Sequence, residues 1–271
     1  MDDETLRRRE WDALVRLRST YESLDRWANR SERIEEPEPG SELATDNDAG
    51  LGIPMYQPAR HAMLAAVQHL NLARHAVEAR QLFPIAHYSV LRGALLGSAR
   101  AVWLLAPHDQ VERQQRTLRA VYDSHRRFRQ YVEGSGMDPE RVDLGATMFA
   151  QLAADAKKRW HPTATLRMDR PPTETEVVAA GAQVTFRDVD QVESVKRLWM
   201  QASGDAHGLP WPAMTRPSTK VTQQGWLPGY SRRMITVTSG VDLHEFENSF
   251  SLVFRMTRRA WSLFDQRAEH H

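Results

Sequence analysis

The segment SGDAHGLPW brings a hydroxyl, a carboxylate and an imidazole close together, in Ser203, Asp205 and His207. On a continuing helix, Ser203 and His207 lie one turn apart on the same face, within hydrogen-bonding reach. Side chains of these types predict either hydrolysis with a serine nucleophile or acid–base cleavage of RNA by His207. For RNA cleavage, Arg92 or Arg197 is the expected partner of the phosphate.

The same segment also has the features of a helix end. Gly208 suits the left-handed conformation that follows many helices, and Pro210 is typical of the residues that stop one. His207 in the last turn stabilises the negative end of the helix dipole. A serine nucleophile needs an exposed turn such as Gly-x-Ser-x-Gly, which the sequence does not contain. We therefore favour a structural role for this segment and keep catalysis as the alternative.

Several other kinds of site are excluded by residue type and spacing. The chain has no cysteine, which excludes disulfides, thiolate zinc sites, iron–sulfur clusters and a cysteine nucleophile. Neither His-x-x-x-His nor Glu-x-x-His occurs, so these two ways of placing a pair of metal ligands on one helix face are absent. Gly-rich phosphate-binding loops are absent as well. The sequence therefore predicts no metal and no cofactor.

Positive charge is concentrated outside the first fifty residues. Residues 1–50 hold 14 of the 35 acids and only 8 of the 36 basic side chains, so the rest of the chain has 28 bases, 21 acids and a formal charge of +7. Many of these bases are arginines of a helix expected at 109–133, which favours contact with nucleic acid. Arginines near a helix C-terminus also stabilise the helix dipole, which is the structural alternative. The candidate nucleic-acid contacts are Arg116, Arg119, Arg126 and Arg127.

Apolar residues recur at helical spacing along most of the chain. With the short joints between successive helices, this predicts an all-α fold, an antiparallel helical bundle of about seven to eight helices with little or no β structure. Residues 208–240 are rich in proline and glycine, and we expect an irregular segment there with one short strand at MITVTS. The helices are expected at about 58–83, 85–105, 109–133, 138–160, 173–181 and 190–207, with a last one from about 241.

The first 34 residues form a predicted helical arm with an apolar stripe on one face. An acidic segment rich in proline and glycine, 35–57, follows as a linker that loosens the arm from a bundle domain at 58–271. The stripe must pack on this chain or on a second copy, and we expect a homo-oligomer through it. Another protein partner and RNA or DNA stay open, and no membrane contact is expected. The stripe consists of Leu14, Leu17, Tyr21 and Leu24.

Two segments carry a family resemblance, YSVLRGALLGSARAVWLLAP at 88–107 and RLWMQASGDAHG at 197–208. Together they resemble a group of uncharacterised all-helical proteins of actinobacteria and their phages. The resemblance implies a helical fold and no particular activity. That group has a glutamate one turn after the arginine, where this chain has Leu96 and Gly97. The ribonuclease fold known as HEPN is also helical, and it serves as an analogy of architecture.

These observations predict a non-catalytic, cytoplasmic interaction protein that acts through homodimer or protein-partner contacts. The chain has no apolar run of about 18 residues that would span a membrane. Its first residues, MDDETLRRRE, open with acids where a secretory signal would be basic and then apolar. The alternative function is an RNA-acting, HEPN-like ribonuclease, as a toxin or phage-defence component.

Overall fold

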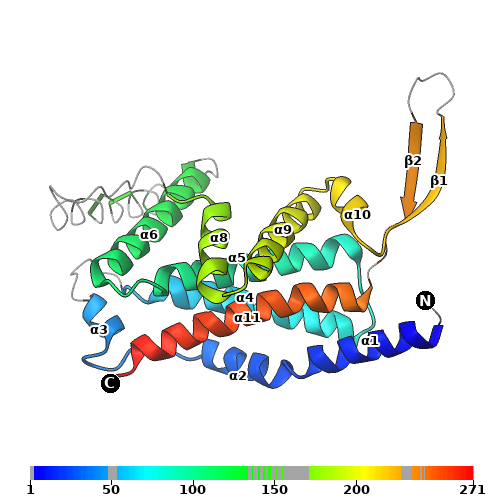
Figure 1. Ribbon diagram of the computed structural model, residues 1–271. Coiled ribbons are helices and arrows are strands. Elements are labelled where there is room, and N and C mark those ends of the chain that lie inside the picture. Colours follow the sequence, from blue (N-terminus) through cyan, green and yellow to red (C-terminus); the bar gives the residue numbers. More distant parts are fainter. Residues whose placement is uncertain are drawn as a thin grey trace.

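The computed structural model describes residues 3–47, 54–133, 171–226, 233–238 and 242–270, with Gly240 and isolated positions between 136 and 154. These residues form packed helices and one two-stranded hairpin (Figure 1), which confirms the predicted all-α fold. The helix predicted at 138–160 lies mostly outside the described residues. In chain order the elements are α1 (Asp3–Arg18), α2 (Tyr21–Ser31), α3 (Glu42–Asp46), α4 (Gln57–Glu78), α5 (Pro84–Leu105), α6 (Gln110–Glu133), α8 (Glu174–Thr185), α9 (Val189–Ala206), α10 (Trp211–Thr215), β1 (Lys220–Trp226), β2 (Arg233–Thr238) and α11 (Leu243–Ala268).

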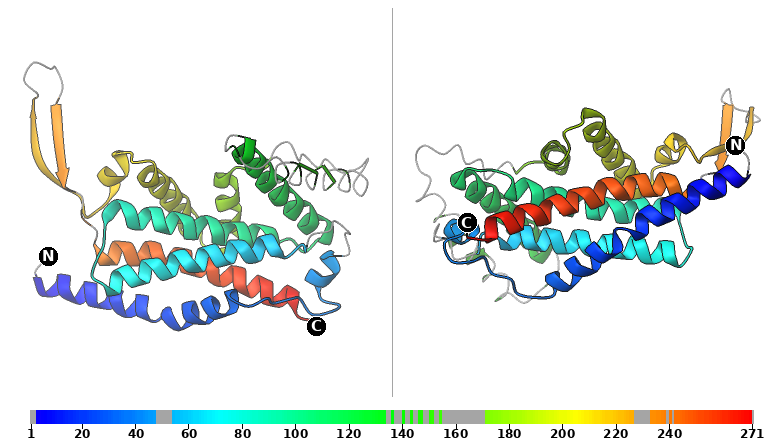
Figure 2. Two further views of the ribbon diagram at one scale, coloured as in Figure 1. Left: turned by 180° about the vertical axis from the view of Figure 1, so that it is seen from behind. Right: turned by 60° about the horizontal axis from the view of Figure 1, so that its bottom comes forward.

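Helix α5 lies at the centre of the bundle and contacts α4, α6, α8, α9 and α11 (Figures 1 and 2). Pro84 occupies its first turn, where a missing N–H costs no helix hydrogen bond. The sequence predicted one apolar stripe on this helix, but small residues let it be buried on most sides. A Cβ at Gly97 would lie 2.6 Å from the carbonyl oxygen of Ala62, so glycine lets α4 and α5 approach closely. A 2.7 Å hydrogen bond between the buried hydroxyls of Ser98 and Thr257 joins α5 to α11.

Helix α8 begins with the predicted capping box. The Thr173 hydroxyl accepts a hydrogen bond from the Glu176 N–H at 3.2 Å, and the Glu176 carboxylate accepts one from the Thr173 N–H at 2.7 Å. The helix continues beyond Gly181, where the sequence predicted its end. Gly181 is buried against α5, and a Cβ there would lie 3.0 Å from the Cα of Ala99. This glycine therefore serves helix packing rather than helix termination.

The N-terminal arm consists of two helices and packs on its own chain. Leu17 and Leu24 are fully buried in the core shared with α4, α5 and α11. Leu14 and Tyr21 are partly buried against the same core. Because α1 contacts α11 and α2 contacts α4, these four residues do not form the exposed dimer surface that the sequence predicted. Figure 2 shows the arm lying along the bundle. An apolar stripe requires a packing partner, but its spacing does not specify which one.

The described parts of the predicted linker, residues 35–47 and 54–57, lie against the bundle and are not loose. Asp46 of α3 accepts two hydrogen bonds from the Arg113 guanidinium of α6, at 2.7 and 2.9 Å, and both side chains are buried. Arg113 also donates to the carbonyl oxygens of Pro107 and His108, at 3.0 and 2.8 Å. This buried ion pair anchors the linker to the joint between α5 and α6.

The segment between α9 and α11 is more regular than predicted. Helix α10 packs closely on α9 at Gly204, where a Cβ would lie 2.6 Å from the Cγ of Pro212. Strands β1 and β2 then form an antiparallel hairpin whose register shifts between Val221 and Gln223. Strand β2 contains most of the predicted strand MITVTS. The hairpin projects from the bundle (Figure 1).

Candidate functional site

The C-terminal end of α9 has the geometry of a capped helix end. Gly208 has a φ angle of 67°, in the left-handed region that favours glycine. Its N–H donates to the Asp205 carbonyl, and the Leu209 N–H donates to the Gly204 carbonyl, both at 2.9 Å. This pair of bonds is the Schellman motif, with His207 as the C-cap residue. The predicted structural role of Gly208 is therefore confirmed.

Ser203 binds an arginine in place of the predicted histidine. Arg92 of α5 donates from Nε to the Ser203 hydroxyl at 3.1 Å and from Nη2 to the Glu174 carboxylate of α8 at 2.9 Å. Its guanidinium also lies over the Trp199 ring, 4.5 Å from the ring centroid. Arg92 thus ties α5, α8 and α9 together, and the acid that pairs with it comes from α8 and not from the next turn of α5.

Asp205 is held in a buried ion pair. Its carboxylate binds Arg216, which follows α10, and each side chain is only 2% exposed. The Arg216 guanidinium lies 4.4 Å from the centroid of the Tyr88 ring on α5. Burial raises the pKa of Asp205, and the positive charge of Arg216 opposes that shift. Burial also raises the pKa of Tyr88. The Asp205 carboxylate is therefore part of the packing between α9, α5 and the segment after α10.

His207 and Arg197 lie apart from these contacts. Both side chains are exposed on α9, and Arg197 donates to the Ser194 hydroxyl at 3.0 Å. The predicted cluster of Ser203, Asp205 and His207 is therefore not assembled, because the serine and the carboxylate each bind an arginine. Helical spacing places Ser203 and His207 on one face, but it does not determine which groups bind them. The serine binds Arg92 of α5, and the Asp205 carboxylate binds Arg216, which follows α10. His207 remains exposed one turn beyond Ser203.

Three of the four arginines predicted to contact nucleic acid bind atoms of their own chain. Arg116 donates to the carbonyl oxygen of Trp103 at 2.7 Å and so caps the end of α5. Arg126 and Arg127 share the carboxylate of Asp123, at 2.6 and 2.8 Å. Burial raises the pKa of Asp123, but the hydrogen bonds from these two arginines outweigh it and hold the pKa below its usual range. These contacts give the three arginines a structural role through ion pairs and a capping bond, and not through the helix dipole, because the last turn of α6 holds no basic residue.

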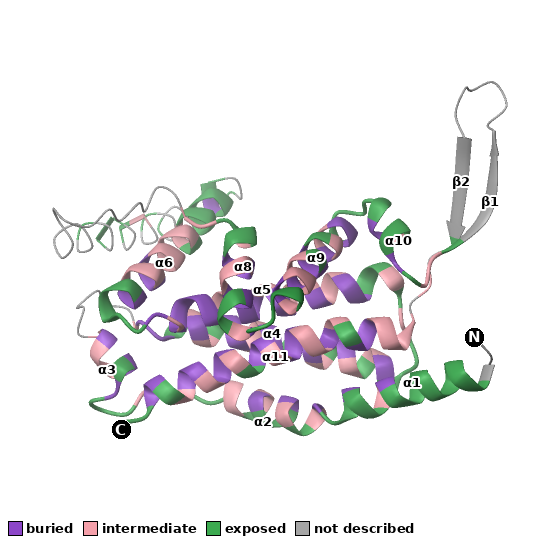
Figure 3. Ribbon diagram, in the orientation of Figure 1, coloured by how far each residue is buried: buried purple, intermediate pink, exposed green. Residues whose placement is uncertain are grey.

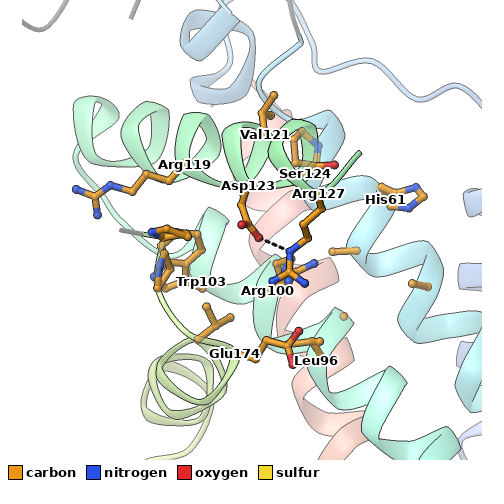
Figure 4. A pocket seen from close by; sticks show the side chains of 18 of the residues that line it. His61, Leu96, Arg100, Trp103, Arg119, Val121, Asp123, Ser124, Arg127 and Glu174 are labelled. Atoms are coloured by element: carbon orange, nitrogen blue, oxygen red, sulfur yellow. Dashed lines mark hydrogen bonds and ion pairs between the residues drawn. The ribbon is translucent and has the colours of Figure 1, made fainter. Parts of the chain in front are cut away.

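The fourth of these arginines, Arg119, lines a pocket of about 750 Å³ among α4, α5, α6 and α8 (Figure 4). Arg100 and Arg127 line the same pocket. Within the described part of the chain, neither Arg100 nor Arg119 has a hydrogen bond or an ion pair, and Nε of Arg119 is buried without an acceptor. Sequence reasoning missed Arg100, because it lies in an apolar run and only the packing of four helices brings it to Arg127.

A second hollow, of about 510 Å³, lies beside the N-terminal part of α1. Residues 4–12 of this helix are exposed on every side (Figure 3), and the Trp11 side chain is 60% exposed. Arg80, on the same hollow, has a φ angle of 56°, a left-handed conformation that is unusual for a residue with a side chain. The lining residues are Arg7, Glu10, Trp11, Leu14, Val77, Arg80, Leu82 and Leu243.

Among the described residues, no three histidine, aspartate or glutamate side chains are grouped to hold a metal ion. In the same part of the chain, no helix has the length and apolar character needed to cross a bilayer. No family model, curated protein or solved structure matches this chain. The function is therefore argued from the geometry of these surfaces.

Proposed function

We propose that this protein is a non-catalytic, cytoplasmic helical interaction protein whose partner is a second copy of the same chain. The observation that carries this proposal is the projecting part of α1, where residues 4–12 are exposed on every side. Helices in folded proteins take most of their stability from packing, and in the single chain no residue of this part is buried. Trp11 adds a large exposed indole, and tryptophan is enriched among the residues that dominate binding energy at interfaces.

The surface around Trp11 has both an exposed apolar anchor and an adjacent hollow, which favours a second copy as the occupant. The indole lies beside an apolar hollow formed in part by Val77 and Leu82, so a two-fold dimer can place each indole in the hollow of its partner. Glu10 and Arg80 bring opposite charges to the same rim, so in such a dimer each can pair with the opposite charge of the second copy. The left-handed backbone of Arg80 belongs to the Schellman motif that ends α4, in which the Gln81 N–H donates to the Ala76 carbonyl at 2.9 Å, and this motif fixes the position of Arg80 on the rim.

Replacing Trp11 with glutamate is expected to convert a dimer into a monomer, because a charged group then replaces the apolar anchor. Light scattering of the full chain at micromolar concentration measures this change. The circular dichroism spectrum should stay the same, because Trp11 is largely exposed. A point substitution is preferable to removal of residues 1–34, which would strip Leu17 and Leu24 from the core.

The matched control is Met214→Glu, since Met214 is 62% exposed on α10 and lies outside this surface. This variant should remain a dimer. A monomeric unmodified chain, or a Trp11→Glu variant that stays dimeric, contradicts the proposal.

A second function, RNA cleavage, is favoured by one observation. The contact between Arg92 and Ser203, at 3.1 Å, brings a guanidinium to α9 one turn before the exposed His207. In this alternative, exposed His207 transfers the proton while Arg92 turns from Glu174 to the phosphate.

Labelled single-stranded RNA separates the two functions. If the second is right, the full chain cleaves it, and His207→Ala lowers the rate by about 100-fold or more, the usual contribution of an acid–base group. His108→Ala is the control, because His108 is also exposed and lines neither hollow. If the unmodified chain does not cleave the RNA, this alternative is wrong. If the His207→Ala variant cleaves it as fast as the unmodified chain, His207 is not the acid–base group and the alternative is also wrong.

A further inference from the structure

We infer that the pocket among α4, α5, α6 and α8 binds a small organic phosphate, with its phosphate group held by Arg100 and Arg127. The pocket lies on a different part of the bundle from the Trp11 surface, and the inference does not depend on the dimer. Its volume of about 750 Å³ is within the range usual for small-molecule sites. The walls come from four helices, so the site is built by the fold.

The charges at this pocket leave an excess of positive charge for a ligand. Arg126 and Arg127 share the single carboxylate of Asp123, and Arg100 has no acid partner within the described residues. The other carboxylate in the lining, Glu174, is already paired with Arg92. The pocket lining therefore contains three arginines, Arg100, Arg119 and Arg127, and only one carboxylate that is not paired with Arg92, that of Asp123. An excess of two positive charges matches a phosphomonoester, which carries about −1.5 to −2 at pH 7.

The arginine side chains are placed to share one phosphate. In Figure 4, Arg100 from α5 and Arg127 from α6 approach the same part of the pocket beside Asp123. Arg127 uses Nε for its bond to Asp123, so its terminal nitrogens remain for a ligand. A guanidinium donates through parallel N–H groups that fit phosphate oxygens well.

His69 supplies a neutral group on the same lining. Its imidazole lies against Gly93, where a Cβ would be only 2.4 Å from Nε2, so α5 has glycine at this position. Burial lowers the pKa of His69, which keeps the ring uncharged near neutral pH. An uncharged imidazole can donate one hydrogen bond to the ligand without adding charge.

The remaining lining favours a ligand larger than inorganic phosphate. Arg119 extends away from Arg100 in Figure 4, so a phosphate between Arg100 and Arg127 leaves it unsatisfied. The buried Nε of Arg119 lacks an acceptor, and a buried donor of this kind gains free energy when a ligand supplies one. The rest of the wall is largely apolar and suits a carbon skeleton. Its apolar residues include Ala62, Ala65, Leu96, Val121 and Val177.

A small molecule fits these observations better than a nucleic acid. A concave pocket encloses a compact ligand, whereas a strand of RNA needs a row of available cations along a surface. On α6, Arg126 and Arg129 bind the acids Asp123 and Glu133 of the same helix. Arg100 and Arg119, which have no hydrogen bond or ion pair among the described residues, both line the pocket.

Calorimetric titration of the full chain with four small probes and one alternative ligand tests the inference. The probes are adenosine 5′-monophosphate, 1-naphthyl phosphate, inorganic phosphate and unphosphorylated adenosine. The alternative ligand is a short RNA without a terminal phosphate. The two organic phosphates should bind saturably, inorganic phosphate more weakly, and adenosine not at all. Arg100→Gln should weaken the organic phosphates by about tenfold or more, because a charge-assisted contact is lost.

The matched control is Arg129→Gln, an exposed arginine of α6 outside the pocket, which should bind as the unmodified chain does. Arg100 has no partner to lose within the described part of the chain, so its variant should unfold at the same temperature as the unmodified chain. Arg119→Gln, at the other end of the pocket, should also weaken the organic phosphates. The inference is overturned if no phosphorylated probe binds saturably, or if Arg129→Gln weakens binding as much as Arg100→Gln. Binding of RNA alone, unaffected by Arg100→Gln, also overturns it.

Discussion

The Asp205→Asn variant is expected to lose about 3–5 kcal/mol of the free energy of unfolding, the usual cost of removing one partner from a buried ion pair. The amide keeps the shape of the carboxylate but not its charge, and Arg216 is left with its charge in a site that is 2% exposed. Urea denaturation at neutral pH, followed by circular dichroism, measures the loss. Such a loss identifies Asp205 as a packing residue of α9, whereas a catalytic carboxylate would be replaced at little cost in stability.

Two controls make this result specific. Glu133→Gln removes one partner of the exposed ion pair between Arg129 and Glu133, and it should cost less than about 1 kcal/mol. The double variant Asp205→Leu with Arg216→Met replaces both charges by apolar groups, and it should be more stable than Asp205→Asn alone. A single variant as stable as the unmodified chain would show that the ion pair does not hold α9 in place.

Asp46→Asn is expected to cost about 3 kcal/mol by the same mechanism, at the lower end because Arg113 keeps a second acid. That acid is Glu42, whose carboxylate lies 2.9 Å from the Arg113 guanidinium. The variant should also release the linker, because Asp46 is its buried contact with α6. Limited digestion with a glutamate-specific protease measures this local effect, since Glu36 and Glu38 lie in the linker.

Cleavage in the linker should become faster by on the order of 100-fold, if opening of this segment is the step that the ion pair opposes. Asp109→Asn is the control, because Asp109 is exposed and only caps α6. Equal cleavage rates for Asp46→Asn and the unmodified chain would mean that the linker is held by other contacts.

Helix boundaries were predictable where a local signal sets them. Pro84 at the start of α5, the capping box of Thr173 and Glu176, and Gly208 after α9 all act through residues close in sequence. Gly181 shows the limit of such signals, because its buried contact with α5 prevails over its tendency to end a helix.

The candidate sites were less predictable, because their partners lie far apart in the sequence. Spacing placed Ser203 and His207 on one face, but it gave no indication that Arg92 would reach the hydroxyl from α5. The same holds for Arg100, which faces its pocket only because α4, α5, α6 and α8 pack together. For the N-terminal arm, the apolar stripe predicted a helix that packs on a partner. It did not show that this partner is the arm's own chain, at α4 and α11.

The central position of α5 has a consequence for synthesis of the chain. Its neighbour α4 precedes it directly, but α11, which supplies Thr257 to the buried bond with Ser98, is made 159 residues later. On the ribosome, the side of α5 that α11 covers therefore stays uncovered until the last helix emerges. A premature stop before α11 would leave that apolar surface permanently exposed, so truncated products of this chain should aggregate or be degraded.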